Sequence, residues 1–187
     1  MTFALILTLI VLVLFFFMGI NIYNNLVALK NQMERAWTNI DIILKQRFDE
    51  IPQLIQVIEQ YAQYEQQSFK KIVEARNAYM EAKNIDGKMK AANDLSSGLQ
   101  GLLALGEAYP ELKANASFVQ LQSRVSELEN QIADRRELFN ESVTNFNTRI
   151  EQLPDVFFAR ALGYTEKPLY RPPVEQTTRP SLKMNLG

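Results

Sequence analysis

The chain has 187 residues and a net charge of −1, and it contains neither cysteine nor histidine. The length suits one modest domain, and the balanced charge provides no electrostatic footprint for nucleic acid. The missing side chains exclude disulfides, thiolate and imidazole metal sites, cysteine nucleophiles and serine–histidine catalysis.

The N-terminal 29 residues, MTFALILTLIVLVLFFFMGINIYNNLVAL, contain no charged side chain. The apolar core of this stretch, residues 3–22, has about the ~20 residues that a helix needs to cross ~30 Å of hydrocarbon. No basic residue precedes the core and no Ala-x-Ala-like cleavage site follows it, which disfavours a cleaved signal peptide. We predict that residues 1–22 form a retained transmembrane anchor, with burial in a soluble core as the alternative.

Basic side chains follow this segment, while only the α-amino group precedes it. They are Lys30, Arg35, Lys45 and Arg47. The positive-inside rule therefore predicts an N-terminus outside and a C-terminal domain in the cytoplasm.

Beyond the span, apolar residues recur at alternating spacings of three and four. The first run comprises Ile22, Leu26, Leu29, Met33, Trp37, Ile40 and Leu44. This period is typical of an amphipathic helix packed against others, and no breaker separates it from the span. We predict one continuous helix that ends near Arg47, because Pro52 suits the first turn of a second helix.

The second predicted helix ends near Lys83, and Asp86-Gly87 is a strong turn signal. A third helix over residues 88–107 contains three glycines, which serve as close-packing points or simply weaken the helix. The fourth helix, residues 117–152, has the clearest apolar stripe, with Ser117 as a candidate cap.

These elements predict an all-α protein in which an N-terminal transmembrane helix is continuous with an antiparallel four-helix bundle, packed like a coiled coil, over residues 23–163. Residues 164–187 contain four of the seven prolines and no apolar period, so we expect an extended or disordered tail. Its "PLYRPP" motif could alternatively dock as a polyproline ligand.

In up-and-down topology, two connections meet at the end of the bundle farthest from the membrane. Their residues form a candidate interaction tip: Arg47, Asp49, Glu50, Pro52, Tyr109, Pro110, Lys113 and Asn115. Helix capping and the helix dipole account for Arg47, Asp49 and Glu50 without a binding role, since acids favour helix starts and arginine favours helix ends; a tip that binds a partner is the alternative. Two further charged residues interrupt the apolar stripes, and we predict a structural ion pair between Glu65 and Arg136.

Several segments resemble the LemA family of bacterial membrane proteins. They are "YNNLV", "AWTNIDIILKQRFDEIPQLIQVIEQYAQYE" and "EAYPELKANASFVQLQSRVSELENQIADRRELFNESVTNFNTRIEQLP". The resemblance covers residues 23–164. Positions matching recurrent family residues are Tyr23, Asn24, Leu26, Trp37, Arg47, Ile51, Pro52, Leu54, Tyr61, Glu65, Tyr109, Pro110, Leu112, Lys113, Asn115, Phe118, Leu121, Gln122, Glu129, Asn130, Ile132, Ala133, Arg136, Phe139, Asn140, Phe146, Asn147 and Pro154.

The chain departs from the family pattern at Gln53, where asparagine is common, and at Tyr64, where histidine is common. The resemblance implies a single N-terminal anchor in the bacterial inner membrane, a cytoplasmic helical domain and no established enzymatic activity. It also implies a link to magnetosome membranes and to genes for membrane proteases.

We therefore expect a non-enzymatic scaffold or adaptor without cofactor or metal. Its partners would be the lipid bilayer, a protein still to be identified and copies of the chain itself. Two alternatives remain open: an oligomer that organises or remodels the membrane, or an adaptor of a membrane protease system. A third, an enzyme that uses the Glu65 carboxylate, has less support because the apolar stripes contain few inward acids.

Overall fold

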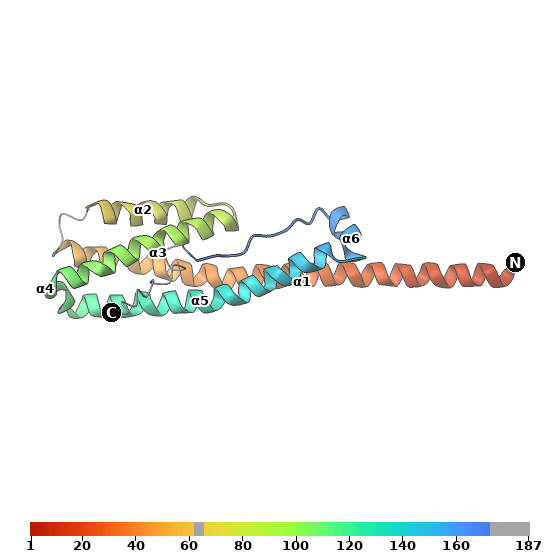
Figure 1. The fold of residues 1–187 in the computed structure, drawn as a ribbon, viewed down its shortest axis with the longest axis horizontal. Coiled ribbons are helices and arrows are strands. Elements are labelled where there is room, and N and C mark those ends of the chain that lie inside the picture. The colour runs from red at the N-terminus through yellow and green to blue at the C-terminus, as the bar shows by residue number, and fades with distance from the viewer. Residues whose placement is uncertain (62–65, 173–187) are drawn as a thin grey trace, which may run out of the picture. The chain divides into compact units, whose positions relative to one another are not determined.

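A computed structural model describes residues 1–61 and 66–172, without the side chains of 66–68 and 105–107. Within these residues the chain forms six helices and no strand (Figure 1). The helices are α1 (Thr2–Glu59), α2 (Gln66–Glu81), α3 (Ile85–Ala108), α4 (Pro110–Lys113), α5 (Ala116–Glu151) and α6 (Asp155–Ala161). The all-α prediction is confirmed.

The chain folds into two compact units. The first consists of Met1–Ile40 and Arg135–Leu169, and the second consists of Asp41–Asp134 and Tyr170–Gly187. The long helices α1 and α5 contribute residues to both units.

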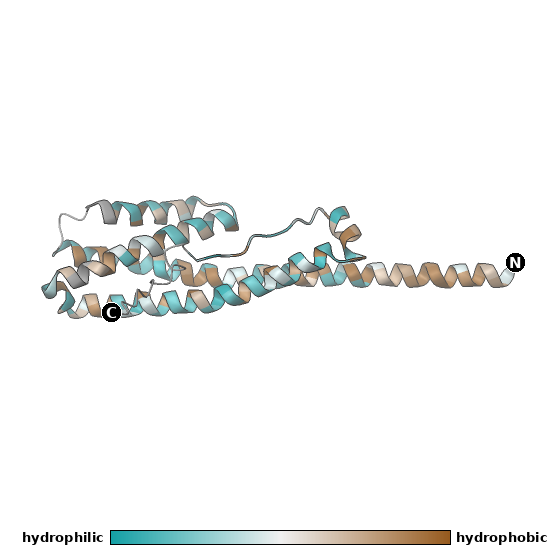
Figure 2. Cartoon of the chain, viewed as in Figure 1, coloured by the Kyte–Doolittle hydropathy of each residue, from teal (hydrophilic) through white to brown (hydrophobic). Residues whose placement is uncertain are grey.

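The N-terminal part of α1 is almost entirely hydrophobic (Figure 2). Its most apolar 18-residue window has a mean hydropathy of 3.0, and none of that window is buried within the protein. Among the described residues, α1 is the one helix that is long and apolar enough to cross a membrane. Because the same helix continues to Glu59, the apolar segment is continuous with the bundle helix, as predicted.

The predicted helix end near Arg47 is wrong, because α1 runs through Pro52 for seven more residues. Proline inside a helix removes one backbone hydrogen bond and costs about 3 kcal/mol. Pro52 itself is exposed, whereas Phe48, Ile51 and Leu54 are at most 2% exposed. Burial of this unbroken stripe offsets the cost of the proline.

Two predicted helix starts are corrected by side-chain caps. Asp86 and Gly87 lie within the first turn of α3, where Asn84 Oδ1 accepts a hydrogen bond from Gly87 N (2.8 Å). At the start of α5, Asn115 Oδ1 accepts from the backbone N of Ser117 and Phe118 (2.9 and 3.1 Å), so Asn115, and not Ser117, is the cap. Asparagine satisfies the orphan amides at a helix start well.

In the second unit, α1, α2, α3 and α5 form the antiparallel four-helix bundle (Figure 1). Each helix contributes fully buried apolar side chains at helical spacing. Examples are Leu44, Phe48, Ile51 and Leu54 in α1, Ile72 and Tyr79 in α2, Leu95 and Leu99 in α3, and Phe118, Val125 and Leu128 in α5. The stripe that the sequence predicts is thus the core of the bundle.

The first unit pairs the part of α1 that precedes Asp41 with the C-terminal part of α5. Trp37 packs edge-on against Phe139, with ring centroids 5.6 Å apart. Phe146 lies 5.6 Å from Tyr164, which follows α6. These aromatic contacts add to the apolar area that the unit buries.

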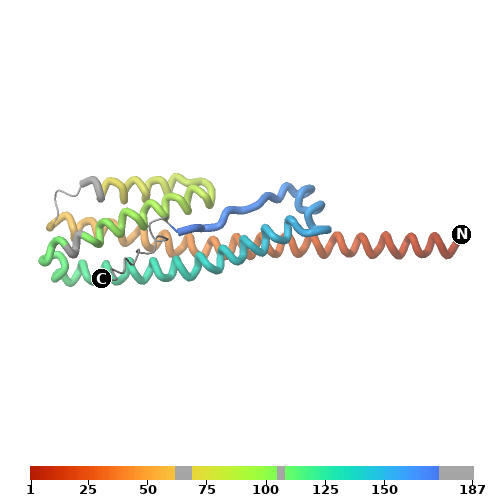
Figure 3. The backbone as a smooth tube through the Cα atoms, viewed as in Figure 1, coloured from red at the N-terminus to blue at the C-terminus, as the bar shows by residue number. Residues whose placement is uncertain are grey.

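The chain from Gly163 to Pro172 has no regular secondary structure (Figure 3). In the first unit, Asn147 holds Lys167 through two hydrogen bonds, one to its carbonyl (2.8 Å) and one from its amide (2.9 Å). In the second unit Tyr170 is 1% exposed, and the carbonyl of Arg171 accepts from Asn93 (2.9 Å). The predicted tail therefore begins as an ordered segment, and residues 173–187 lie outside the described residues.

Candidate functional site

A fully buried arginine lies at the centre of the second unit. Arg47 of α1 is 0% exposed and forms an ion pair with Glu129 of α5. It also donates to Ser96 Oγ and to the carbonyl oxygen of Ala92, both in α3 and both at 3.0 Å. Ser96 Oγ lies 3.1 Å from the same Glu129 carboxylate oxygen, so three helices share one polar cluster.

The position of Arg47 follows from the apolar period of α1. It lies three residues after Leu44 and four before Ile51, on the face that both residues bury. A charge on this face must be paired, and removing one partner of such a pair is strongly destabilising. Because arginine does not deprotonate in proteins, the Arg47 guanidinium itself offers no general acid or base.

A shallow pocket of about 240 Å³ opens above this cluster. The residues that line it come from α3 and α5: Ser96, Leu99, Gln100, Leu103, Val125, Ser126, Glu129 and Asn130. Its charged lining residue, Glu129, already neutralises Arg47. The lining of the pocket is therefore polar and apolar, and its one carboxylate is already paired with Arg47.

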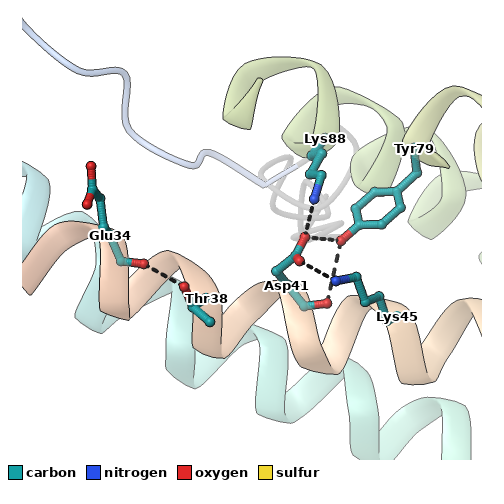
Figure 4. A network of polar contacts seen from close by, with 6 residues as sticks. All are labelled: Glu34, Thr38, Asp41, Lys45, Tyr79 and Lys88. Carbon is teal, nitrogen blue, oxygen red and sulfur yellow. Dashed lines mark hydrogen bonds and ion pairs between the residues drawn. The ribbon is translucent and has the colours of Figure 1, made fainter. Parts of the chain in front are cut away.

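A second polar cluster joins α1, α2 and α3 around Asp41 (Figure 4). The Asp41 carboxylate accepts hydrogen bonds from Tyr79 (2.5 Å) and Lys88 (2.7 Å), and it lies 2.8 Å from Lys45. Burial has the largest single effect and raises the pKa of Asp41, but Lys45, Lys88 and Tyr79 together outweigh it and lower the pKa from 3.8 to about 2. Burial and then Asp41 raise the pKa of Tyr79, so the phenol stays protonated as a donor.

An open groove of the second unit lies between the C-terminal part of α1 and the N-terminal part of α5. It has a volume of about 1110 Å³. The lining residues are Glu50, Gln53, Gln56, Val57, Ala116, Ser117, Val119, Gln120, Leu121, Ser123, Arg124 and Glu127. Arg124 forms ion pairs with Glu50 (3.7 Å) and Glu127 (2.8 Å), so both signs of charge share this surface.

The residues of the predicted interaction tip have different surroundings. Arg47 lies in the interior, which corrects its predicted place at an exposed turn. Asp49, Pro52, Pro110 and Lys113 are exposed, whereas Glu50, Tyr109 and Asn115 are half-buried. Of these residues, Glu50 lines the groove.

Asn115 Nδ2 donates to Tyr61 Oη (3.0 Å), which brings the start of α5 close to the chain just beyond α1. The link between α4 and α5 therefore lies beside Tyr61, and not beside a turn at residues 47–52. The predicted ion pair between Glu65 and Arg136 stays a prediction, because Glu65 lies outside the described residues.

Sequence reasoning identified Arg47 and Glu129 as positions that match family residues but did not pair them. The signal was available, because Arg47 continues the i, i+3, i+4 spacing of the buried stripe and Glu129 directly follows buried Leu128. Asp41 and Tyr79 were missed because their neighbours come from three helices that are far apart in the sequence. Within residues 1–61 and 66–172, no group of three acidic side chains is placed to hold a metal ion.

The comparison with protein families gives one match. The sequence model of the LemA family matches residues 36–184, which is most of the chain and includes both polar clusters. No curated protein matches the chain. On the extent of the family match, the chain belongs to the LemA family.

Proposed function

We propose that this chain is a non-enzymatic, membrane-anchored scaffold that binds copies of itself and a protein partner. The anchor is the N-terminal part of α1 in a bacterial inner membrane, with the bundle in the cytoplasm. The observation that carries the proposal is α1 itself, which combines a membrane-length apolar segment and a bundle helix in one unbroken element.

The two polar clusters support a structural role in preference to a catalytic one. Each charged group in them is paired within the bundle: Arg47 with Glu129, and Asp41 with Lys45 and Lys88. Catalytic acids and bases instead require a titratable group that faces a substrate in a cleft with a pKa near the working pH. A carboxylate whose pKa is lowered to about 2 serves as a fixed anion.

The groove between α1 and α5 is the surface that we assign to self-association. A two-fold interface requires one patch that complements itself. This groove carries Glu50 and Glu127 beside Arg124, and Val119 at its rim is 49% exposed. Two copies related by a two-fold axis can exchange these ion pairs and cover the apolar rim.

The absence of cysteine from the sequence allows a direct test. In full-length protein reconstituted in lipid vesicles, Gln120→Cys places one thiol in the groove. Lys90→Cys places a matched exposed thiol on α3, outside the groove. Mild oxidation should crosslink the Gln120→Cys protein into dimers and leave the Lys90→Cys protein monomeric.

Light scattering of the detergent-purified protein provides the second measurement. The proposal expects a protein mass that is a multiple of the 21.5 kDa chain. A strictly monomeric mass, together with equal crosslinking of the two variants, would contradict self-association through the groove.

Membrane organisation is the second candidate, and one feature favours it. Phe15, Phe16 and Phe17 are 58–67% exposed on the apolar segment of α1, where neighbouring anchors could pack. Large assemblies that persist when the groove carries Arg124→Glu, and that disappear when the three phenylalanines are replaced by leucine, would support this candidate over the scaffold.

A further inference from the structure

The short helix α6 has two faces of opposite character. Its inner face consists of Asp155 and Ala159, which are 2% and 1% exposed. Asp155 forms an ion pair with Arg149 near the end of α5, and this contact orients the helix. On the outer face Phe157 is 64% exposed, and Leu153 in the preceding turn is 76% exposed.

A glycine cap defines the C-terminal end of α6. Gly163 has φ of +69°, a conformation that glycine adopts without strain. This allows Tyr164 N to donate back to the carbonyl of Ala159 (2.9 Å), as in a Schellman motif. The outward position of Phe157 therefore belongs to a defined helix and not to a loose connection.

Phe158 brings α6 against the apolar segment of α1. A Cβ atom added at Gly19 would lie 3.3 Å from two ring atoms of Phe158, so the ring rests directly on the α1 backbone. An open apolar depression of about 420 Å³ surrounds this contact. It is lined by Phe15, Phe16, Gly19, Ile20, Tyr23 and Phe158.

The depth of this contact matches the edge of a membrane. Gly19 lies three residues before Ile22, where the predicted hydrocarbon span ends, so Phe158 meets α1 about 4–5 Å inside that end. Amphipathic helices that lie in the interface bury their apolar face ~5–10 Å deep. Tyr23 also lies at this level, where tyrosine is common in membrane proteins.

We propose that α6 and the turn before it form an interfacial foot, defined as residues 153–162, whose outer face lies in the lipid acyl-chain boundary. The argument is continuity: through Phe158 the foot contacts a segment of α1 that is itself unburied and apolar, and Phe157 and Leu153 are exposed beside that contact in the sequence. Arg160 is exposed on the same helix, so its stem can lie along lipid while the guanidinium reaches headgroup phosphates. This inference rests on the proposed membrane anchor.

Quenching by brominated lipid tests the foot in the full-length protein. An environment-sensitive fluorophore is attached to a single introduced cysteine, Phe157→Cys in one variant and Leu153→Cys in another. Leu12→Cys marks the middle of the apolar segment, and Glu141→Cys marks an exposed polar position on α5 in the same unit. The vesicles contain phosphatidylcholine brominated in its acyl chains.

The foot predicts several-fold stronger quenching at positions 157 and 153 than at position 141, and quenching at position 12. Quenching at position 12 alone would overturn the foot and leave the anchor intact. No quenching at any position would refute the anchor itself. A blue-shifted but unquenched probe at both 153 and 157 would also overturn the foot, because it would show that a second copy of the chain covers this face.

Discussion

Arg47 and Glu129 are 82 residues apart in the sequence and form an ion pair that ties α1 to α5 inside the four-helix bundle. The two sides of this pair differ, because Arg47 is 0% exposed and the Glu129 side chain is 28% exposed. The guanidinium therefore has no access to water, and it depends on its protein partners for solvation.

Removal of the carboxylate should cost more than replacement of the whole pair. Glu129→Gln removes the carboxylate that pairs with the buried Arg47 guanidinium, and we expect a loss of about 3 kcal/mol in the free energy of unfolding. In Arg47→Met/Glu129→Gln the buried charge is gone, and we expect part of that stability to return. The measurement is denaturant unfolding of the full-length protein in detergent, followed by circular dichroism.

Arg124→Gln with Glu127→Gln provides the matched control, because this pair is largely exposed and its loss should change stability by less than about 1 kcal/mol. A double variant at positions 47 and 129 that is no more stable than Glu129→Gln alone would contradict the argument.

The lowered pKa of Asp41 makes the stability of the bundle depend on pH in acid. The pKa is 3.8 before folding and about 2 in the folded protein, so the unfolded chain binds the proton first. The stabilisation is present above pH ~4 and is lost as the pH falls through ~2. We expect thermal unfolding of wild type to shift down between pH 4 and pH 2 by more than that of Asp41→Asn.

Asp49 offers a control for this titration, because its side chain is exposed and lies on the same helix. Asp49→Asn should retain the acid sensitivity of wild type. Identical pH profiles for wild type and Asp41→Asn would exclude the cluster as the source.

The sequence predicted the helical class and the continuity of α1 because both depend on local patterns of apolar residues. It placed the end of α1 at the wrong residue because Pro52 resembles a helix start, and only the burial of Phe48, Ile51 and Leu54 shows why the helix continues. Asp86 and Asn115 illustrate the same difficulty. Both are turn-forming residue types, but Asp86 lies inside the first turn of α3, whereas Asn115 caps the start of α5.

The polar clusters could not be predicted because their geometry depends on how helices rotate against each other. Glu129 and Ser96 meet Arg47 through contacts over 82 and 49 residues of sequence. Spacing identifies the face on which each residue lies, but it does not identify the partner helix or the register.

Two glycines of α3 should respond in opposite directions to the same substitution. A Cβ atom at Gly98 would lie 2.9 Å from Ile72 Cγ1 of α2, whereas at Gly101 nothing lies within 4 Å. Alanine gains about 1 kcal/mol over glycine in a helix interior when the space is free. We expect Gly101→Ala to raise the free energy of unfolding by up to that amount, and Gly98→Ala to lower it because the contact between α2 and α3 must open.

Gly98 is thus a close-packing point, whereas Gly101 only weakens the helix. Both interpretations of the α3 glycines therefore apply, each at a different position. Equal stabilisation by the two alanines, measured by thermal unfolding, would show that α2 can shift without cost.

The segment after α6 should loosen when Asn147 is shortened. Asn147 makes both hydrogen bonds that hold the backbone of Lys167, and the side chain is the sole partner that the structure shows for that backbone within the described residues. In Asn147→Ala both bonds are lost, so we expect the Lys167 amide to exchange hydrogen with solvent markedly faster. Hydrogen exchange measured by mass spectrometry on peptides that cover residues 164–172 tests this expectation.

Asn145→Ala is the control, because it removes an exposed amide two residues earlier on α5 and should leave the exchange unchanged. Since a hydrogen bond contributes only about 1 kcal/mol, the melting temperature of the bundle should move little in either variant. Equal exchange at Lys167 in wild type and Asn147→Ala would mean that the packing of the segment, and not Asn147, holds it in place.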